Sequence, residues 1–331
     1  MTASALAGTH SQNSEDPRVS ARIASETRQD WVFRWLLFGA ATLVLVCLGA
    51  AAISMLVGGR LAFQTFGWAF LVSDDWDAVE KHFGAFVPIY GTLVSSAIAM
   101  LIAVPVSFGI ALFLTEIAPT WMRGPVGAAI ELLAGIPSII YGMWGLFSFA
   151  PFMAAHVLPW VRTHLAGIPG IGALFQGPPL GIGMLTAGIV LGIMVIPFIS
   201  SVMRDVFRTV PASLKESSYA LGSTTWEVVW NVVLPYTRSA VLGGIFLGLG
   251  RALGETMAVT FVLGNAHQLN VSLLMPGNSI AAAIANEFTE ADSEIYLSSL
   301  IALAFLLFVV TFIVLAIARL MLRGLERKEG R

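Results

Sequence analysis

An arginine and a glutamate, Arg251 and Glu255, stand four residues apart inside an apolar stretch of about residues 240–263. The stretch is long enough to cross a membrane, and Arg251 lies near its middle. A charge at that depth costs on the order of 2.5–3.5 kcal/mol on insertion scales. We therefore expect both side chains to face helices or a water-filled path, one turn apart on the same helical face.

Two interpretations of this pair remain open. In the first, Arg251 and Glu255 form a structural ion pair that fixes helix packing. In the second, Arg251 lines a path for an anion, because a guanidinium stays protonated and binds tetrahedral oxyanions through two hydrogen bonds. Glu255 would then hold the guanidinium between substrates and release it when an anion arrives.

Other site chemistry is poorly represented in the sequence. The five histidines are scattered, Cys47 is the single cysteine, and the GxxxxGK[ST], HExxH and CxxC patterns are absent. Serine, histidine and aspartate show no recognised catalytic spacing at membrane depth. We expect no catalytic residue, no metal site and no cofactor bound by this chain.

The elements that must position Arg251 and Glu255 are membrane-spanning helices. Hydrophobic residues make up 57% of the chain and charged residues 11%, against about 25% charged residues in soluble domains. Six apolar runs are long enough to cross a bilayer, at about residues 35–57, 88–114, 126–150, 180–203, 240–263 and 296–318. Backbone groups in hydrocarbon must pair internally, so the sequence predicts an all-α polytopic membrane protein with six transmembrane helices.

The distribution of basic residues predicts the orientation. If both termini are cytoplasmic, the outer loops hold only Arg60, Lys81 and Arg162. Arg251 lies within a span, and the remaining basic residues fall on the cytoplasmic side. This strong positive-inside bias predicts a multi-pass protein of the bacterial inner membrane with both termini in the cytoplasm.

A break is expected in the third span, where Gly135 and Pro137 stand close together. Proline removes a backbone hydrogen bond, so this site is predicted to be a helix break or gate. Glu131 lies near the cytoplasmic border of the same span, where it is compatible with a snorkelling interfacial acid.

The cytoplasmic loop 204–237 contains the start and stop signals of two short helices. Gly222 suits the position just past the end of the first helix. Thr224 followed by Glu227 has the form of a capping box that starts the second. Pro235 is expected to stop the second helix before the fifth span.

This loop resembles the EAA loop of ABC importer permeases, with the spacing E-x5-G-x11-L-P. The residues that carry the resemblance are Glu216, Gly222, Leu234 and Pro235. Ser217, Ser218 and Val232 depart from the family pattern, which has two alanines and an isoleucine there. In that family the loop docks into the ATP-binding subunit and couples ATP-driven closure to the membrane helices.

Two membrane stretches resemble a narrower family, the PstC-type permease subunits of phosphate importers. They are GRALGETMAV at residues 250–259 and LAGIPSIIYG at residues 133–142. With the loop, the resemblance covers about residues 88–320 and implies a MetI-like type I ABC importer permease fold. The family's membrane arginine and glutamate, implicated in phosphate passage, map onto Arg251 and Glu255.

The resemblance also implies partners. These are a second homologous permease subunit, two cytoplasmic ATP-binding subunits, a periplasmic phosphate-binding protein, phosphate itself and membrane lipid, with no nucleic acid. The chain would not be an enzyme by itself, because ATP and Mg would be used on the partner ATPase. Acidic residues exceed basic ones in the outer loops, which disfavours an open anion channel and favours delivery by a docked binding protein.

The expected organisation follows from these assignments. Residues 1–30 read as a disordered cytoplasmic tail, 31–57 as an uncleaved accessory helix too long for a signal peptide, and 58–87 as a periplasmic loop. The permease domain occupies 88–320, with the coupling loop at 204–237, and 321–331 form a cytoplasmic tail.

Three alternatives stay open. A permease for another oxyanion, such as sulfate or molybdate, would carry the same Arg–Glu pair. A stand-alone channel or secondary transporter would work without partners, but it leaves the bent-helix loop without a purpose. An intramembrane enzyme lacks a catalytic pair in the sequence.

Overall fold

The computed structural model describes residues 17–329, with side chains described for residues 30–320. The chain divides into two units, one extending to Ser54 and the other beginning at Met55. Helix α1 (Pro17–Gly58) forms the described part of the first unit up to Ser54, and its described apolar side chains are mostly exposed. Of the expected tail 1–30, residues 17–30 are helical and residues 1–16 lie outside the described residues.

The second unit holds the remaining elements. Between α1 and the second crossing lie α2 (Arg60–Phe66), α3 (Ala69–Val72), β1 (Trp76–Asp77) and β2 (His82–Phe83). The next elements are α4 (Phe86–Leu112), the π-turn η1 (Phe113–Ile117), α5 (Thr120–Ala134), α6 (Ser138–Trp144), η2 (Gly145–Phe149), α7 (Ala150–Phe152), η3 (Met153–Val157), α8 (Leu158–Leu165) and η4 (Gly172–Phe175). The chain continues through α9 (Met184–Arg208), α10 (Ala212–Ala220), α11 (Thr225–Val228), η5 (Val229–Val233), α12 (Leu234–Leu253), α13 (Met257–Leu263), α14 (Ile280–Glu287) and α15 (Glu294–Glu329).

Six helices in the described part of the chain are long and apolar enough to cross a membrane, as predicted from the sequence. Two predicted boundaries are wrong. The third predicted span, 126–150, is divided by a break after Ala134, and its apolar helix runs from Ser138 to Leu165. The fifth, 240–263, is divided after Leu253. In both places a glycine ends the helix, which a hydropathy window does not register.

The core of the second unit lies where α4 and α12 approach α9. A Cβ at Gly188 of α9 would stand 2.6 Å from the Ile98 side chain, and one at Gly248 of α12 would stand 2.6 Å from Ile199. Glycines at these positions therefore let the helix backbones come close. The surrounding side chains of α9, including Leu191, Val195 and Ile199, are fully buried.

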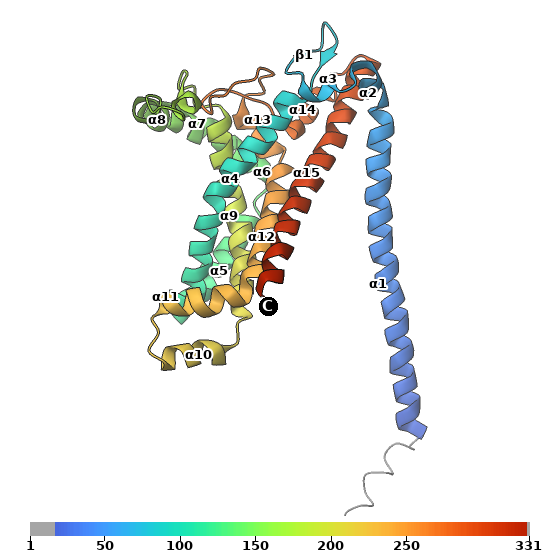
Figure 1. Ribbon diagram of the computed structural model, residues 1–331, viewed down its shortest axis with the longest axis vertical. Coiled ribbons are helices and arrows are strands. Elements are labelled where there is room, and N and C mark those ends of the chain that lie inside the picture. The colour runs from blue at the N-terminus through green and yellow to red at the C-terminus, as the bar shows by residue number, and fades with distance from the viewer. Residues whose placement is uncertain (1–16, 330–331) are drawn as a thin grey trace, which may run out of the picture. The chain divides into compact units, whose positions relative to one another are not determined.

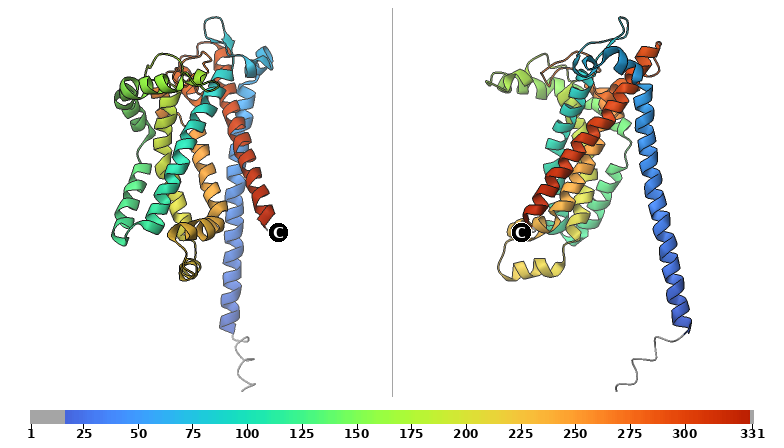
Figure 2. Two further views of the ribbon diagram at one scale, coloured as in Figure 1. Left: turned by 60° about the vertical axis from the view of Figure 1, so that its left-hand side comes forward. Right: turned by 45° about the vertical axis from the view of Figure 1, so that its right-hand side comes forward.

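The second unit has two distinct ends, visible in every view (Figures 1 and 2). Helices α10 and α11 lie at the end where α15 terminates, which we call the α10 end. The β1–β2 hairpin, α7, α8 and α14 lie at the opposite end, which we call the hairpin end. In the hairpin, β1 pairs antiparallel with β2, with Trp76 opposite Phe83.

Pro235 does not stop a helix, contrary to the prediction. The helix that starts at Thr225 continues through η5 and α12 to Leu253, with Pro235 in the first turn of α12. Proline lacks an N–H and clashes with the carbonyl four residues earlier. The π-turn Val229–Val233 widens the helix immediately before the proline, which accommodates the ring without ending the helix.

Candidate functional site

The fifth crossing is interrupted between α12 and α13. Gly254 follows the last residue of α12, and α13 begins at Met257. The carboxylate of Glu255 accepts a hydrogen bond from the backbone N–H of Ala258 at 3.2 Å, satisfying one unpaired donor at the start of α13. Arg251 and Glu255 are therefore on opposite sides of a helix break, and the expectation that they share one helical face is wrong.

Arg251 is exposed in the last turn of α12. Its guanidinium carbon lies 5.8 Å from the centroid of the Phe198 ring of α9. This is a cation–π geometry, and the helix C-terminus also favours a positive charge there. Within residues 30–320, the salt bridges do not include Arg251, so the ion pair with Glu255 is not formed in this structure.

The break in the third crossing is bridged by Tyr141. Gly135 follows the end of α5, and Pro137 precedes the first residue of α6. The Tyr141 hydroxyl donates to the Leu133 carbonyl at 3.1 Å, so a carbonyl at the end of α5 has a partner across the break. The two residues predicted as a helix break thus occupy one, and their role as a gate stays a prediction.

The second halves of the two broken crossings pack together. A Cβ at Gly142 of α6 would stand 2.8 Å from the Phe261 ring, 3.0 Å from the Met257 carbonyl oxygen and 3.1 Å from the Ala258 Cα. Gly142 near the end of α6 therefore lies against the first turn of α13. Arg251 lies three residues before Gly254, at which the break leading to α13 begins.

The residues predicted to couple to the ATPase lie in two different elements. Glu216 is exposed on α10, and Gly222 has φ +87° just past that helix, a conformation that favours glycine. The capping box predicted at Thr224 and Glu227 is present. Leu234 and Pro235 instead lie within the long helix that follows.

Comparison with known proteins places this geometry in a family. Residues 107–327 match the family described as binding-protein-dependent transport system inner membrane component. The phosphate transport system permease protein PstC of Xylella fastidiosa (strain 9a5c) is 65% identical over 305 residues, covering 92% of this chain and 94% of that protein. The chain belongs to this family of transport permeases, as its motifs indicated.

Further similarity extends across this permease family. The PstC protein of Mesorhizobium japonicum is 56% identical, covering 91% of this chain and 92% of its own length. Among solved structures, a bacterial ABC transporter involved in the import of the acidic polysaccharide alginate has a TM-score of 0.56 at 17% identity, covering 92% of this chain and 99% of that one. This second likeness concerns the fold alone and confirms the ABC permease architecture.

At the α10 end, the permease contains two ion pairs that sequence reasoning missed. Arg204, expected in the loop, lies within α9, is 5% exposed and pairs with Glu131 of α5. Lys215 of α10 pairs with Glu116 of η1, with its Nζ 2.6 Å from Oε1. Glu131 is thus an ion-pair partner and not an isolated interfacial acid. Each acid precedes its base by 73 or 99 residues, a separation that no short motif reveals.

At the hairpin end, the permease buries a carboxylate. Glu287 of α14 accepts hydrogen bonds from Trp76 Nε1 at 2.8 Å and from the Tyr296 hydroxyl at 2.7 Å, and its Oε1 lies 2.9 Å from His267 Nε2. Burial raises the pKa of Glu287, but these hydrogen bonds and the histidine together hold it below the ordinary value. The carboxylate thereby joins β1, α14, α15 and the loop after α13.

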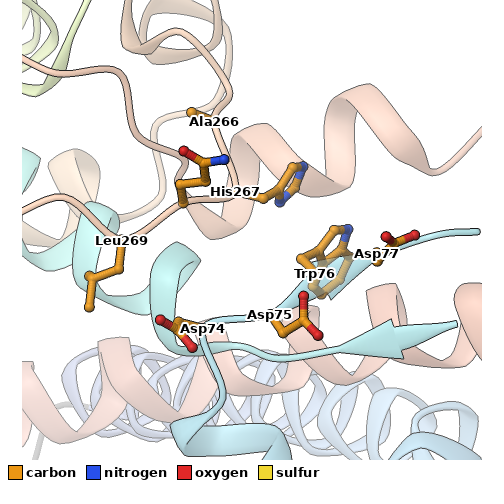
Figure 3. Close-up of a pocket in the computed structure, with 8 residues that line it drawn as sticks. Asp74, Asp75, Trp76, Asp77, Ala266, His267 and Leu269 are labelled. Carbon is orange, nitrogen blue, oxygen red and sulfur yellow. The ribbon is translucent and has the colours of Figure 1, made fainter. Parts of the chain in front are cut away.

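An acidic groove lies beside this carboxylate, with a volume of about 780 Å³ (Figure 3). Its lining residues are Asp74, Asp75, Trp76, Asp77, Ala266, His267, Gln268 and Leu269. The Trp76 and His267 rings stack with centroids 5.6 Å apart. Hydrogen bonds from the backbone N–H groups of Glu80 and Val79 lower the pKa of Asp77, which favours the charged form of this carboxyl.

Proposed function

We propose that this chain is one membrane subunit of an ATP-driven importer that moves inorganic phosphate from the periplasm to the cytoplasm. The observation that carries the proposal is the 65% identity, over 92% of the chain, to a relative named phosphate transport system permease protein PstC. Because the likeness covers nearly all of both chains, the same transport role is the simplest inference.

Arg251 is proposed to line the phosphate path. Its guanidinium is exposed in a crossing, stacks on Phe198 and leaves its hydrogen-bonding edge open to an oxyanion. A bare guanidinium facing lipid at that depth is costly, so this face fits best against a water-filled path completed by a second homologous permease subunit. Glu255 is proposed to act in the same region, through the start of α13.

The energy source is proposed to lie on partner chains. Helix α10 and Gly222 are exposed, as expected of an EAA-type loop that contacts two cytoplasmic ATP-binding subunits using ATP and Mg. The α10 end would then be cytoplasmic and the hairpin end periplasmic, in the bacterial inner membrane. The acidic groove at the hairpin end lowers the local concentration of free phosphate, which favours delivery by a periplasmic binding protein.

The proposal is tested by radiolabelled phosphate uptake into proteoliposomes containing the complete complex and its binding protein. We expect ATP-dependent uptake that unlabelled phosphate competes away and that equal sulfate or molybdate leaves in place. The Arg251→Ala variant should assemble normally and lose uptake, whereas Arg319→Ala, at an exposed position on α15, should retain it.

Three outcomes would contradict the proposal. Equal competition by sulfate would support the other-oxyanion alternative. Phosphate flux through vesicles holding this chain alone would support a channel or secondary transporter. Full uptake by assembled Arg251→Ala complexes would remove Arg251 from the path.

The coupling loop is tested separately. Complexes purified with the Glu216→Ala or Gly222→Ala variant should contain less of the ATP-binding subunit than the wild-type complex.

A further inference from the structure

Helix α10 is attached to the rest of the chain by little side-chain packing. None of its residues is buried, and the hydroxyls of Ser217 and Ser218 bond to Ser213 and Ser223, within α10 and the turn after it. Among its described contacts, Lys215 supplies the ion pair that reaches a distant part of the sequence. A displacement of α10 therefore travels along the two chain ends, through its contacts with α11 and η5, or through Lys215.

The ion pair itself is largely shielded from water. The Lys215 and Glu116 side chains are 18% and 6% exposed, and their charged atoms are 2.6 Å apart. A surface pair would be weak and loosely held. A shielded pair is costly to separate, because each charge would be left uncompensated away from water. The two elements that carry these charges are expected to move together.

Glu116 lies at a junction between two crossings. It belongs to η1, which continues α4. Ala118, the first residue after η1, donates its N–H to the Phe113 carbonyl at 2.7 Å. Arg123 of α5 donates from Nε to the Ala118 carbonyl at 2.8 Å. The junction is thus braced on both sides, and motion at Glu116 reaches α4 and α5 together.

We infer that the Lys215–Glu116 ion pair is a positioning contact that passes movement of α10 to the second and third crossings. Helix α5 ends at the break before α6, so this connection reaches the Gly135–Pro137 region without passing through α9. The inference rests on the proposed function, since it requires an ATPase that moves α10. It assigns Lys215 and Glu116 a part in coupling, beside the exposed residues that meet the ATPase.

The test compares phosphate taken up per ATP hydrolysed in proteoliposomes containing the full complex with its binding protein. Lys215→Met and Glu116→Gln should each lower this ratio roughly 2- to 30-fold while ATP hydrolysis continues. Lys215→Arg should keep most of it. The reversed pair, Lys215→Glu with Glu116→Lys, should recover most of what the single variants lose. Arg319→Gln, an exposed control on α15 and outside the coupling loop, should leave the ratio unchanged.

Two results would overturn the inference alone. The first is an unchanged ratio in assembled single variants. The second is a reversed pair that assembles but takes up as little phosphate per ATP as the single variants. If a single variant fails to assemble, the reversed pair is compared with the wild type, and a low ratio again overturns the inference. A wild-type complex that shows no ATP-dependent phosphate uptake would instead contradict the proposed function, and the inference with it.

Discussion

Arg204 of α9 and Glu131 of α5 form an ion pair in which the two side chains are very unequally exposed. The Arg204 side chain is 6% exposed and that of Glu131 is 57% exposed. Asp205 Oδ1 lies 3.4 Å from the same guanidinium nitrogen, while Nε of Arg204 has no partner in the described part of the chain. A Cβ at Gly127 would collide with this guanidinium, so glycine there makes room for it.

Removing Glu131 is expected to destabilise the permease because Arg204 would keep a buried charge. Glu131→Gln should cost roughly 1–3 kcal/mol, since the amide oxygen can still accept a hydrogen bond but no longer carries a negative charge to compensate Arg204. Asp205→Asn, at the longer contact, should cost less. Thermal unfolding in detergent measures both. If Glu131→Gln proves as stable as the wild type, the pair does not hold α5 to α9.

Filling the contact between α6 and α13 is expected to be unfavourable. Gly142→Ala would place a methyl group against the Phe261 ring and two backbone atoms of α13, costing about 1–3 kcal/mol through overpacking. Gly109→Ala in α4 is the matched control, because a Cβ there meets nothing within 4 Å. Unfolding midpoints should fall for the first variant only, and equal midpoints would contradict the close approach.

The roles of the Glu255 charge and its hydrogen bond can be separated by two substitutions. Glu255→Gln keeps an oxygen acceptor for the Ala258 N–H, whereas Glu255→Ala removes it and should cost about 0.5–2 kcal/mol at the start of α13. Because Glu255 is not paired with Arg251 here, Glu255→Gln should reduce phosphate uptake less than Arg251→Ala. If Glu255→Gln abolishes phosphate uptake while the stability of the protein is unchanged, the charge of Glu255 itself is required.

The cluster around Glu287 should weaken in acid. Its folded pKa lies below the ordinary 4.5, so the unfolded chain takes up the proton first as the pH falls. The stability it contributes is therefore complete above 4.5 and is lost as the pH falls through the folded pKa. The free energies of unfolding of the wild type and of Glu287→Gln should differ at neutral pH and converge well below pH 4.5.

Glu290→Gln, at an exposed position three residues past the end of α14, is the control for this experiment. It should match the wild type throughout the pH range. A stability difference between wild type and Glu287→Gln that persists in strong acid would assign the effect to the shape of the side chain and not to its charge.

The sequence predicted what depends on local pattern. Six crossings, the capping box at Thr224 and the glycine turn at Gly222 follow from periodicity, spacing and one residue's conformational freedom, and the structure contains all three. The family could be inferred because its motifs are contiguous. Each of these signals fits within a short window of the chain.

What failed depends on interactions between distant segments or on how one residue is accommodated. The sequence predicts a loop position for Arg204, because it is the first charge after an apolar run, and only packing against α5 shows why it is buried. Proline normally ends a helix, but the π-turn before Pro235 lets this helix continue. Arg251 and Glu255 have helical spacing, but Gly254 between them ends the helix.

Carrying the helix past Pro235 has a mechanical consequence. The unbroken helix from Thr225 to Leu253 has 29 residues, which makes a rod of about 43 Å with Arg251 near its far tip. A tilt of about 5° around its first turn would sweep that tip sideways by about 4 Å, more than the length of a hydrogen bond. Small rotations at the foot of such a lever are amplified at the guanidinium.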